Sequence, residues 1–324
     1  MVKCTLKNKI KIGVFETIYP LFLALLLFDY KEWDIIFIDK YNLKLNITRN
    51  NFLKIVTKNR WLKIVLIFFK KIYLLLIFYN KKLEIFGQDH VGLGNILVGM
   101  GDFFLIEDGI MNYNMEKAKK IELVQKFKQK IGINVTLGKH QNVKKIYLTG
   151  LAPIPKEIAH KVEIINLKEL WDKKTLEEQD EILNIFLFDL NIKEKIKGRN
   201  IILFTQPLSE DDVITEEEKV KIYSKIIKKY SKDKLIIKTH PREKTDYKNI
   251  FQDYLVLDNP FPFEILTLLN IEFNKVVTLF STAALGLGKE VEVDFYGTEV
   301  HMKILERFGS CDYIMKRNCF LEEE

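Results

Sequence analysis

The chain has 324 residues, of which 48% are hydrophobic and 29% charged, a globular composition with enough length for two domains. Its three cysteines, an odd number without two close-spaced pairs, exclude a disulfide framework and a zinc site and favour a reducing cytoplasm. The formal net charge of +7 is unevenly spread, which indicates a negatively charged partner.

In chain order, the first half reads as strands that alternate with helices. An apolar run over Ile10–Phe15 predicts a strand, and the apolar run that continues to Leu27 predicts a helix. Further strands are predicted at Asp34–Asp39, Leu83–Gly87, Phe103–Ile106, Lys145–Leu148 and Val162–Ile165. Segments long enough for helices separate them, so the pattern favours a parallel sheet in an α/β domain.

Residues 40–83 form a basic and apolar segment with eleven Lys or Arg and no Asp or Glu. Its long apolar runs do not suit nucleic acid and favour a membrane interface. The alternative is that residues 52–80 form one or two buried helices with solvated lysines. No transmembrane helix is expected, because Lys70 and Lys71 interrupt the longest run and Ile18–Phe28 is too short to span a bilayer. No signal-peptide cleavage site follows the basic N-terminus.

A polar stretch at residues 192–200 precedes a second series of elements, which predicts domains of residues 1–195 and 196–324. A helix is predicted over Glu216–Tyr230, with acidic residues in its first turn and lysines in its last. The predicted strands are Ile201–Phe204, Leu235–Lys238, Tyr254–Leu257, Lys275–Leu279 and Val291–Tyr296, with helices from about Pro262 and Ser281. Two Rossmann-like domains follow, with a ligand crevice at the carboxyl ends of the strands between them.

Three predicted strands end in polar residues of the types that catalysis and ligand binding use. One strand ends in Glu107-Asp108-Gly109, which is also a common turn sequence. Another ends in Lys238-Thr239-His240-Pro241-Arg242, where cations and an imidazole face anionic oxygen. The other four histidines have no such setting, and a surface or core role is expected for them.

The third strand end is Ser281-Thr282, at the start of a predicted helix. Helix capping alone would explain Ser281, but the free amides of a helix start also form a seat for phosphate. The sequence has no Asp-x-Asp triplet, so the carboxylate clamp that many sugar-nucleotide enzymes use to hold a divalent cation is missing. The glycines of Gly92-Leu93-Gly94 and Gly286-Leu287-Gly288 lack dinucleotide or P-loop spacing.

Taken in order, Glu107-Asp108-Gly109, His240-Pro241 and Ser281-Thr282 resemble three short motifs shared by bacterial sialyltransferases. The nearest resemblance is to the lipooligosaccharide sialyltransferases of glycosyltransferase family 52, with capsular polysialyltransferases as relatives. It covers about residues 83–296. The resemblance implies a GT-B fold with two Rossmann-like domains facing across a cleft, a CMP-sialic acid donor, inversion at the anomeric carbon and no metal cofactor.

The resemblance also assigns roles to residues. In the C-terminal domain, His240 would give a proton or hydrogen bond to the departing phosphate, beside Lys238 and Pro241, and Ser281 and Thr282 would hold its other oxygens. Glu264 would bind the ribose hydroxyls, although a carboxylate in the first turn of a helix is an equal explanation.

The acceptor hydroxyl needs a base, and the resemblance gives two candidates. Asp108 of the N-terminal, acceptor-side domain is the first choice, and Asp211 is the second, because some family 52 members use a carboxylate from that region. An acidic turn before a helix capped by Thr215 would also explain Asp211.

The expected partners are a CMP-sugar donor, a lipooligosaccharide or other glycan acceptor with terminal galactose, and the inner-membrane surface, to which a cytoplasmic protein would bind peripherally. Nucleic acid is not expected, and a homodimer stays open. Two alternatives remain: a family 52 enzyme that uses another sugar nucleotide, such as a glucosyltransferase, and a non-catalytic nucleotide-binding module at the membrane.

Overall fold

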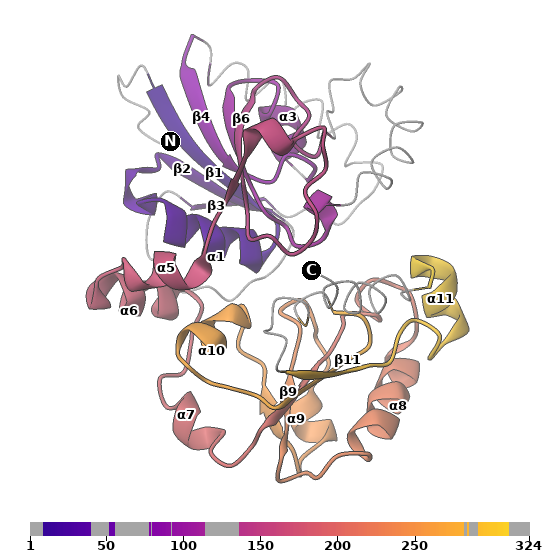
Figure 1. The fold of residues 1–324 in the computed structure, drawn as a ribbon. Helices are drawn as coiled ribbons and strands as arrows, with labels where there is room; N and C mark the ends of the chain where they lie inside the picture. Colours follow the sequence, from indigo (N-terminus) through magenta and orange to yellow (C-terminus); the bar gives the residue numbers. More distant parts are fainter. Residues whose placement is uncertain are drawn as a thin grey trace. The chain divides into compact units, whose positions relative to one another are not determined.

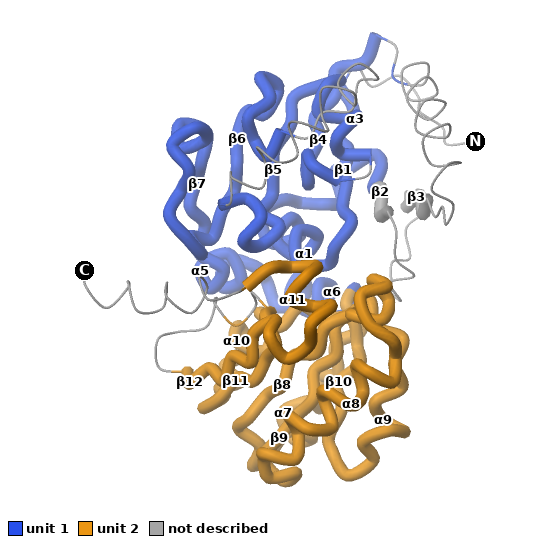
Figure 2. The backbone as a smooth tube through the Cα atoms, turned by 90° about the vertical axis from the view of Figure 1, so that its right-hand side faces the viewer, with its two compact units in different colours: residues 1–42, 46–185 blue, residues 43–45, 186–324 orange. Residues whose placement is uncertain are grey.

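The computed structural model describes residues 9–39, 52–55, 78, 80–91, 93–113, 136–281, 284 and 291–310. These residues belong to two compact units that divide between Ile185 and Phe186 (Figure 2). The division lies before the boundary that the polar stretch predicts at 195/196. The ring of Phe188 packs against that of Phe261 with centroids 5.0 Å apart, so the chain already belongs to the second unit here. Most of the basic segment 40–83 lies outside the described residues.

Unit 1 is built on a parallel sheet with the strand order β3-β2-β1-β4-β5-β6-β7 (Figure 1). Its strands are β1 (Lys9–Phe15), β2 (Ile35–Asp39), β3 (Phe52–Ile55), β4 (Lys82–Gly87), β5 (Asp102–Ile106), β6 (Val143–Leu148) and β7 (Val162–Ile164). All the predicted strands of this half are present. Residues 52–55 are a strand, so the alternative of buried helices is wrong there.

The β1 strand shows why these apolar runs become central strands. Its residues Ile10, Ile12 and Val14 are at most 3% exposed and lie in the core on one face of the sheet. On the other face, Gly13 leaves room for Trp33, since a Cβ atom at Gly13 would lie 2.9 Å from the indole ring. A strand covered on both faces needs apolar residues at nearly every position, and β1 provides them from Ile12 to Phe15, all of which are buried.

The helices of unit 1 are α1 (Ile18–Leu27), α3 (Gly94–Leu97), α5 (Leu167–Asp172) and α6 (Leu176–Ile185). Helix α1 contacts β1, β4, β5 and α5, and its residues from Pro20 to Leu26 are buried (Figure 1). Within the described residues, no helix combines the length and apolar character that crossing a membrane requires.

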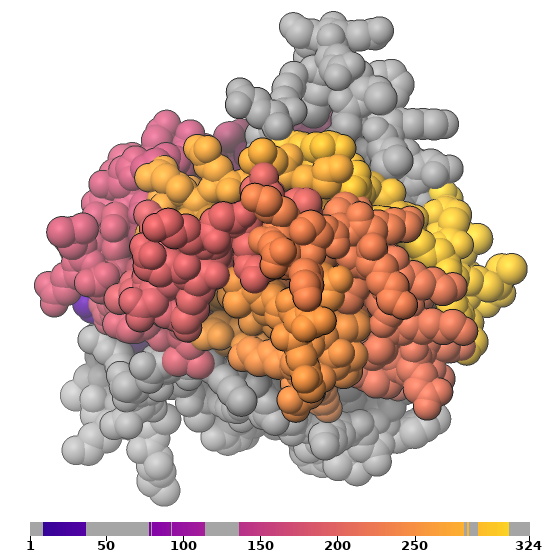
Figure 3. Space-filling view, turned by 90° about the horizontal axis from the view of Figure 1, so that it is seen from below, coloured from indigo at the N-terminus to yellow at the C-terminus, as the bar shows by residue number. Residues whose placement is uncertain are grey.

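Unit 2 is built on a smaller parallel sheet with the order β10-β9-β8-β11-β12. The strands are β8 (Ile201–Phe204), β9 (Leu235–Lys238), β10 (Leu255–Leu257), β11 (Lys275–Thr278) and β12 (Glu292–Phe295). The helices are α7 (Ile192–Lys195), α8 (Glu216–Ile227), α9 (Tyr247–Ile250), α10 (Glu264–Leu268) and α11 (Met302–Phe308). Figure 3 shows a face on which unit 2 residues, coloured red to orange, form a continuous layer of side chains.

Both sheets have the doubly wound strand order, which reverses beside the first strand of each unit. In unit 1 the reversal lies between β1 and β4, and in unit 2 it lies between β8 and β11. Ligands of such sheets bind outside the carboxyl ends of the strands near this reversal. The fold therefore directs attention to the residues that follow β1, β4 and β5 in unit 1, and β8, β9 and β11 in unit 2.

Candidate active site

In unit 1, a fully buried carboxylate joins the ends of β5 and β6. Glu107 accepts hydrogen bonds from the Tyr113 hydroxyl (2.6 Å), the Thr149 N–H (2.6 Å) and hydroxyl (2.8 Å), and the Tyr19 hydroxyl (3.2 Å). Burial raises the pKa of Glu107 although these hydrogen bonds oppose the rise. Because both oxygens are used inside the unit, Glu107 serves to fix the turn from which Asp108 projects.

Asp108 lies at the carboxyl edge of the sheet with its side chain 19% exposed. The Thr17 hydroxyl, which follows β1, donates to its Oδ1 over 2.9 Å, and Nε2 of His90 lies 3.3 Å from its Oδ2. The Asp108 N–H donates to Asn112 over 2.6 Å. Three neighbouring strand ends thus meet at this carboxylate, which is oriented and still open to solvent. These features suit a group that takes a proton from a bound hydroxyl.

His90 sits between two carboxylates. Its Nδ1 lies 3.7 Å from Oδ1 of Asp89, which is fully buried and accepts hydrogen bonds at Oδ2 from Thr136 and Gly138. Burial alone would lower the pKa of His90, but the interactions with Asp108 and Asp89 outweigh it and raise the pKa to about 9. The ring is therefore a cation at neutral pH.

The sequence predicted only a surface or core role for His90, and the structure instead places it against Asp108. The signal in the sequence was the run Gln88-Asp89-His90 directly after an apolar strand, the same arrangement that drew attention to Asp108. Only the pairing of β4 with β5 shows that these two strand ends are neighbours.

In unit 2, His240 and Ser281 lie at one edge of the same sheet. His240 follows β9, Ser281 follows β11, and both strands pair with β8, which lies between them. Strands stand about 4.8 Å apart, so the two strand ends are roughly 10 Å from each other, close enough to reach one phosphate group with their side chains. Thr205 follows β8 in the middle of this edge.

The hydrogen bonds of His240 define the state of its ring. Nδ1 accepts from the Arg242 N–H over 3.1 Å. Burial, with the positive charges of Arg242 and Lys238, lowers the pKa of His240 to about 3. A neutral imidazole whose Nδ1 is an acceptor carries its proton on Nε2. His240 is thus assigned as a neutral hydrogen-bond donor rather than as an imidazolium.

Lys238, which the sequence placed against the donor, is only 4% exposed. Its ammonium donates to the carbonyls of Thr239 (2.9 Å) and Asn259 (3.1 Å) and lies 4.5 Å from the centre of the Phe261 ring. Burial lowers the pKa of Lys238 to about 8. In this arrangement Lys238 ties the end of β9 to the loop after β10, and a direct contact with the donor stays a prediction.

Asp211, the second candidate base, forms a bidentate ion pair with Arg242. The guanidinium donates to Oδ1 over 2.5 Å and to Oδ2 over 2.9 Å. Both oxygens of this carboxylate are therefore engaged by one guanidinium. Both oxygens of Asp108 also have partners, Thr17 and His90, and the choice between the two carboxylates as the base stays a prediction.

The remaining predicted residues are placed as follows. The Ser281 N–H donates to the Thr278 hydroxyl over 2.9 Å, and its side chain is half-buried. Pro241 is half-buried in the turn after β9, and Glu264 is the half-buried first residue of α10. Thr282 lies outside the described residues, as does most of the helix predicted to start near Ser281.

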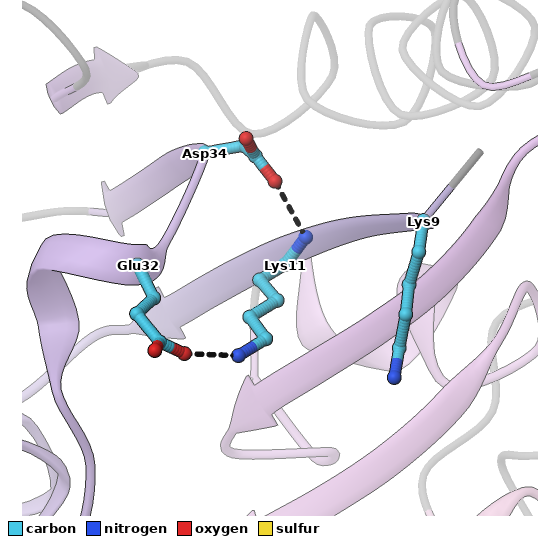
Figure 4. A pocket seen from close by; sticks show the side chains of 4 residues that line it. All are labelled: Lys9, Lys11, Glu32 and Asp34. Atoms are coloured by element: carbon cyan, nitrogen blue, oxygen red, sulfur yellow. Dashed lines mark hydrogen bonds and ion pairs between the residues drawn. The ribbon is translucent and has the colours of Figure 1, made fainter. Parts of the chain in front are cut away.

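A shallow pocket of about 300 Å³ lies at the opposite edge of the unit 1 sheet (Figure 4). It is lined by Lys9, Lys11, Glu32 and Asp34, which stand at the amino ends of β1 and β2. Lys11 pairs with Glu32, and the Lys9 ammonium lies 2.7 Å from Glu84. Its charges are matched within the protein, so the pocket is a structural feature. Among the described residues, His, Cys, Asp and Glu form no group of three suited to a metal ion.

Comparison with known proteins identifies the class. The fold resembles an α/β-galactoside α-2,3-sialyltransferase of Photobacterium phosphoreum (16% identity, TM-score 0.55, 90% of each chain). It also resembles a 2,6-sialyltransferase of a Photobacterium species, solved with donor product CMP and acceptor substrate lactose (13% identity, TM-score 0.56, 88% of this chain and 71% of that one). A UDP-GlcNAc 2-epimerase of Methanocaldococcus jannaschii shares the fold (13% identity, TM-score 0.50, 93% and 92%). The protein therefore has the GT-B fold.

The profile of glycosyltransferase family 52 matches residues 34–304. The chain is also 46% identical over 229 residues to an uncharacterized protein of Haemophilus influenzae, covering 71% of this chain and 73% of that protein. The protein belongs to glycosyltransferase family 52, which confirms the family that its three short motifs resemble.

Proposed function

We propose that this family 52 glycosyltransferase transfers sialic acid from CMP-sialic acid to a terminal sugar, galactose in the first instance, of a lipooligosaccharide or another surface glycan. The observation that carries the proposal is the neutral His240 ring, with its proton on Nε2, at the same sheet edge as Ser281. A sialyltransferase of the same fold was solved with CMP and lactose, which supports this donor and acceptor class.

In the proposed reaction, the acceptor hydroxyl oxygen attacks the anomeric carbon of the sialic acid while the bond from that carbon to the phosphate oxygen breaks. The hydroxyl proton passes to Asp108, and CMP leaves with the bonding electron pair. Attack opposite the leaving group inverts the configuration. Nε2–H of His240 and the hydroxyls of Ser281 and Thr282 would donate to the phosphate, which carries one phosphoryl group and so needs no metal ion in this proposal.

The role of His90 in this scheme is to orient Asp108. Nε2 of the imidazolium lies 3.3 Å from Oδ2 of Asp108, and Asp89 holds the ring from its other side. Asp108 therefore keeps a fixed direction when it receives the acceptor proton.

One assay tests both the proposed donor and the proposed base. When the purified protein is incubated with CMP-sialic acid and lactose in EDTA, we expect CMP to be released from the donor. Asp108→Asn should lower the rate by 10²–10⁴-fold or so, the usual contribution of a general base, and Asp211→Asn by less than about tenfold. No CMP release while another sugar nucleotide is consumed would contradict the donor, and a larger loss in Asp211→Asn than in Asp108→Asn would contradict the base.

We also propose that residues 40–83, with their eleven basic side chains, hold the cytoplasmic protein at the inner membrane, where a lipid-linked acceptor would be available. The protein should float with vesicles that contain anionic lipid and not with neutral vesicles. Equal binding to both, or to neither, would contradict this.

A further inference from the structure

Glu243 is a buried carboxylate for which the reaction scheme has no use. Its side chain is 1% exposed and is surrounded by donors from four parts of unit 2. At Oε2 it accepts from the His240 N–H (2.8 Å) and from the Thr205 hydroxyl. At Oε1 it accepts from the Tyr247 hydroxyl (2.9 Å), and the Lys219 ammonium lies 3.7 Å away.

A turn hydrogen bond between Glu243 and His240, three residues apart, would by itself be a local feature. Tyr247, the first residue of α9, is also close in sequence, but Thr205, which follows β8, and Lys219 of α8 come from distant segments. The carboxylate therefore joins the ends of β8 and β9 at the edge where His240 lies. Tyr223, also fully buried, reinforces this edge by accepting the Gln206 N–H over 2.7 Å.

Charge balance does not explain why the side chain is an acid. The fully buried Lys219 already has two hydrogen bonds to Glu210, at 2.9 and 3.1 Å, and Glu216 lies 3.4 Å away. Three carboxylates thus face one ammonium, and Glu243 is the most distant of them. Burial raises the pKa of Glu243, so its charge is unfavourable where it lies. Pairing with Lys219 alone therefore does not account for a carboxylate at this position.

We propose that Glu243 is a positioning residue, whose carboxylate fixes the backbone of His240 so that Nε2–H of the ring faces the phosphate of the donor. The inference rests on the function proposed above. The His240 backbone N–H is held by Glu243 and also lies 3.3 Å from the Thr205 hydroxyl. Nδ1 of the ring accepts from the Arg242 N–H, so Nε2–H is the donor that remains on the ring.

Glu243→Gln tests this with almost no change of shape. An amide has one acceptor oxygen, whereas both the His240 N–H and the Lys219 ammonium can only donate, so one of them would face an NH₂ group. Loss of a charge-assisted hydrogen bond to the His240 turn should lower kcat/KM by about tenfold or more. The melting temperature should change by less than about 3 °C, since the substitution also removes an unfavourable buried charge.

Tyr230→Phe is the matched control. The Tyr230 hydroxyl donates to Asp294 over 2.5 Å at the far edge strand β12, so its loss should lower stability and leave kcat/KM unchanged. The ¹⁵N chemical shifts of the His240 ring give a second readout, with a single Nε2–H tautomer expected in the wild type and a mixture in Glu243→Gln. Unchanged kcat/KM in Glu243→Gln, or a loss fully explained by its unfolded fraction, would overturn the inference.

The outcomes separate this inference from the proposed function. If the wild-type protein does not turn over CMP-sialic acid, the proposed donor is refuted. The tautomer of the His240 ring in the wild type and in Glu243→Gln then still decides the role of Glu243. A wild type that turns over CMP-sialic acid beside an equally active Glu243→Gln refutes the positioning role and leaves the donor in place.

Discussion

At the scale of single residues, the two units hold histidine in opposite ways. Two carboxylates hold His90 as a cation, whereas cations and burial keep His240 neutral. Histidine allows both because its ordinary pKa lies near neutrality and its surroundings decide its charge. In the proposed reaction, the first ring would orient Asp108, and the second would present one N–H group to the phosphate.

The raised pKa of His90 predicts a dependence of stability on pH. Because the pKa in the folded protein, about 9, exceeds the ordinary value of 6.5, the ion pairs stabilise the fold fully below pH 6.5 and are lost as pH rises through 9. Their contribution is on the order of 2–3 kcal/mol. The free energy of unfolding of the wild type should exceed that of His90→Gln at pH 6, and the difference should shrink by pH 10.

Urea denaturation at several pH values measures this difference. His160→Gln, at an exposed histidine, serves as the control and should follow the wild type throughout. A difference between wild type and His90→Gln that stays constant from pH 6 to pH 10 would show that no proton on His90 stabilises the fold.

At the scale of elements, α8 is a helix whose start was predictable from the sequence, whereas its end, predicted at Tyr230, lies at Ile227. Thr215 accepts from the Glu218 N–H over 3.1 Å, and Glu218 accepts from the Thr215 N–H over 2.7 Å, which is a complete capping box. Glu216, Glu217 and Glu218 add negative charge to the first turn. The same helix carries Lys219, its fourth residue, into the buried cluster beside Glu243. The residue at which the helix begins therefore determines where the Lys219 ammonium is buried.

Thr215→Ala should lower the free energy of unfolding by about 1 kcal/mol, because it removes the capping oxygen. The rate of CMP release should stay at the wild-type value, since the threonine does not touch the residues of the proposed site. Chemical denaturation and the CMP-release assay measure the two effects. A loss of rate without a loss of stability would assign Thr215 a role that capping does not explain.

Elements defined by local pattern were predictable from the sequence, and elements defined by distant partners were not. The strands β1, β5, β8 and β9 follow from apolar runs, and α8 from its charges. The short strand β3 was not predicted, because its basic and apolar surroundings carry no clear period. The sequence also shows that Lys238 and Arg242 are positively charged. It does not show their partners, Asn259 and Asp211, because these come from other segments that only the fold brings close.

At the scale of the whole molecule, two doubly wound sheets each place reactive side chains at the carboxyl ends of their strands. Unit 1 contributes a solvent-accessible carboxylate, Asp108, and unit 2 contributes the donors His240 and Ser281. Membership of glycosyltransferase family 52 shows that the protein is a glycosyltransferase. In the proposed reaction, unit 1 supplies the base and unit 2 supplies the donors to the phosphate.

A crystal structure of the protein soaked with CMP tests the phosphate site most directly. We expect the phosphate within hydrogen-bond distance of both Nε2 of His240 and the Ser281 hydroxyl, at the carboxyl edge of the unit 2 sheet. CMP bound with its phosphate at another edge, or with the His240 ring turned away from it, would refute the proposed phosphate site.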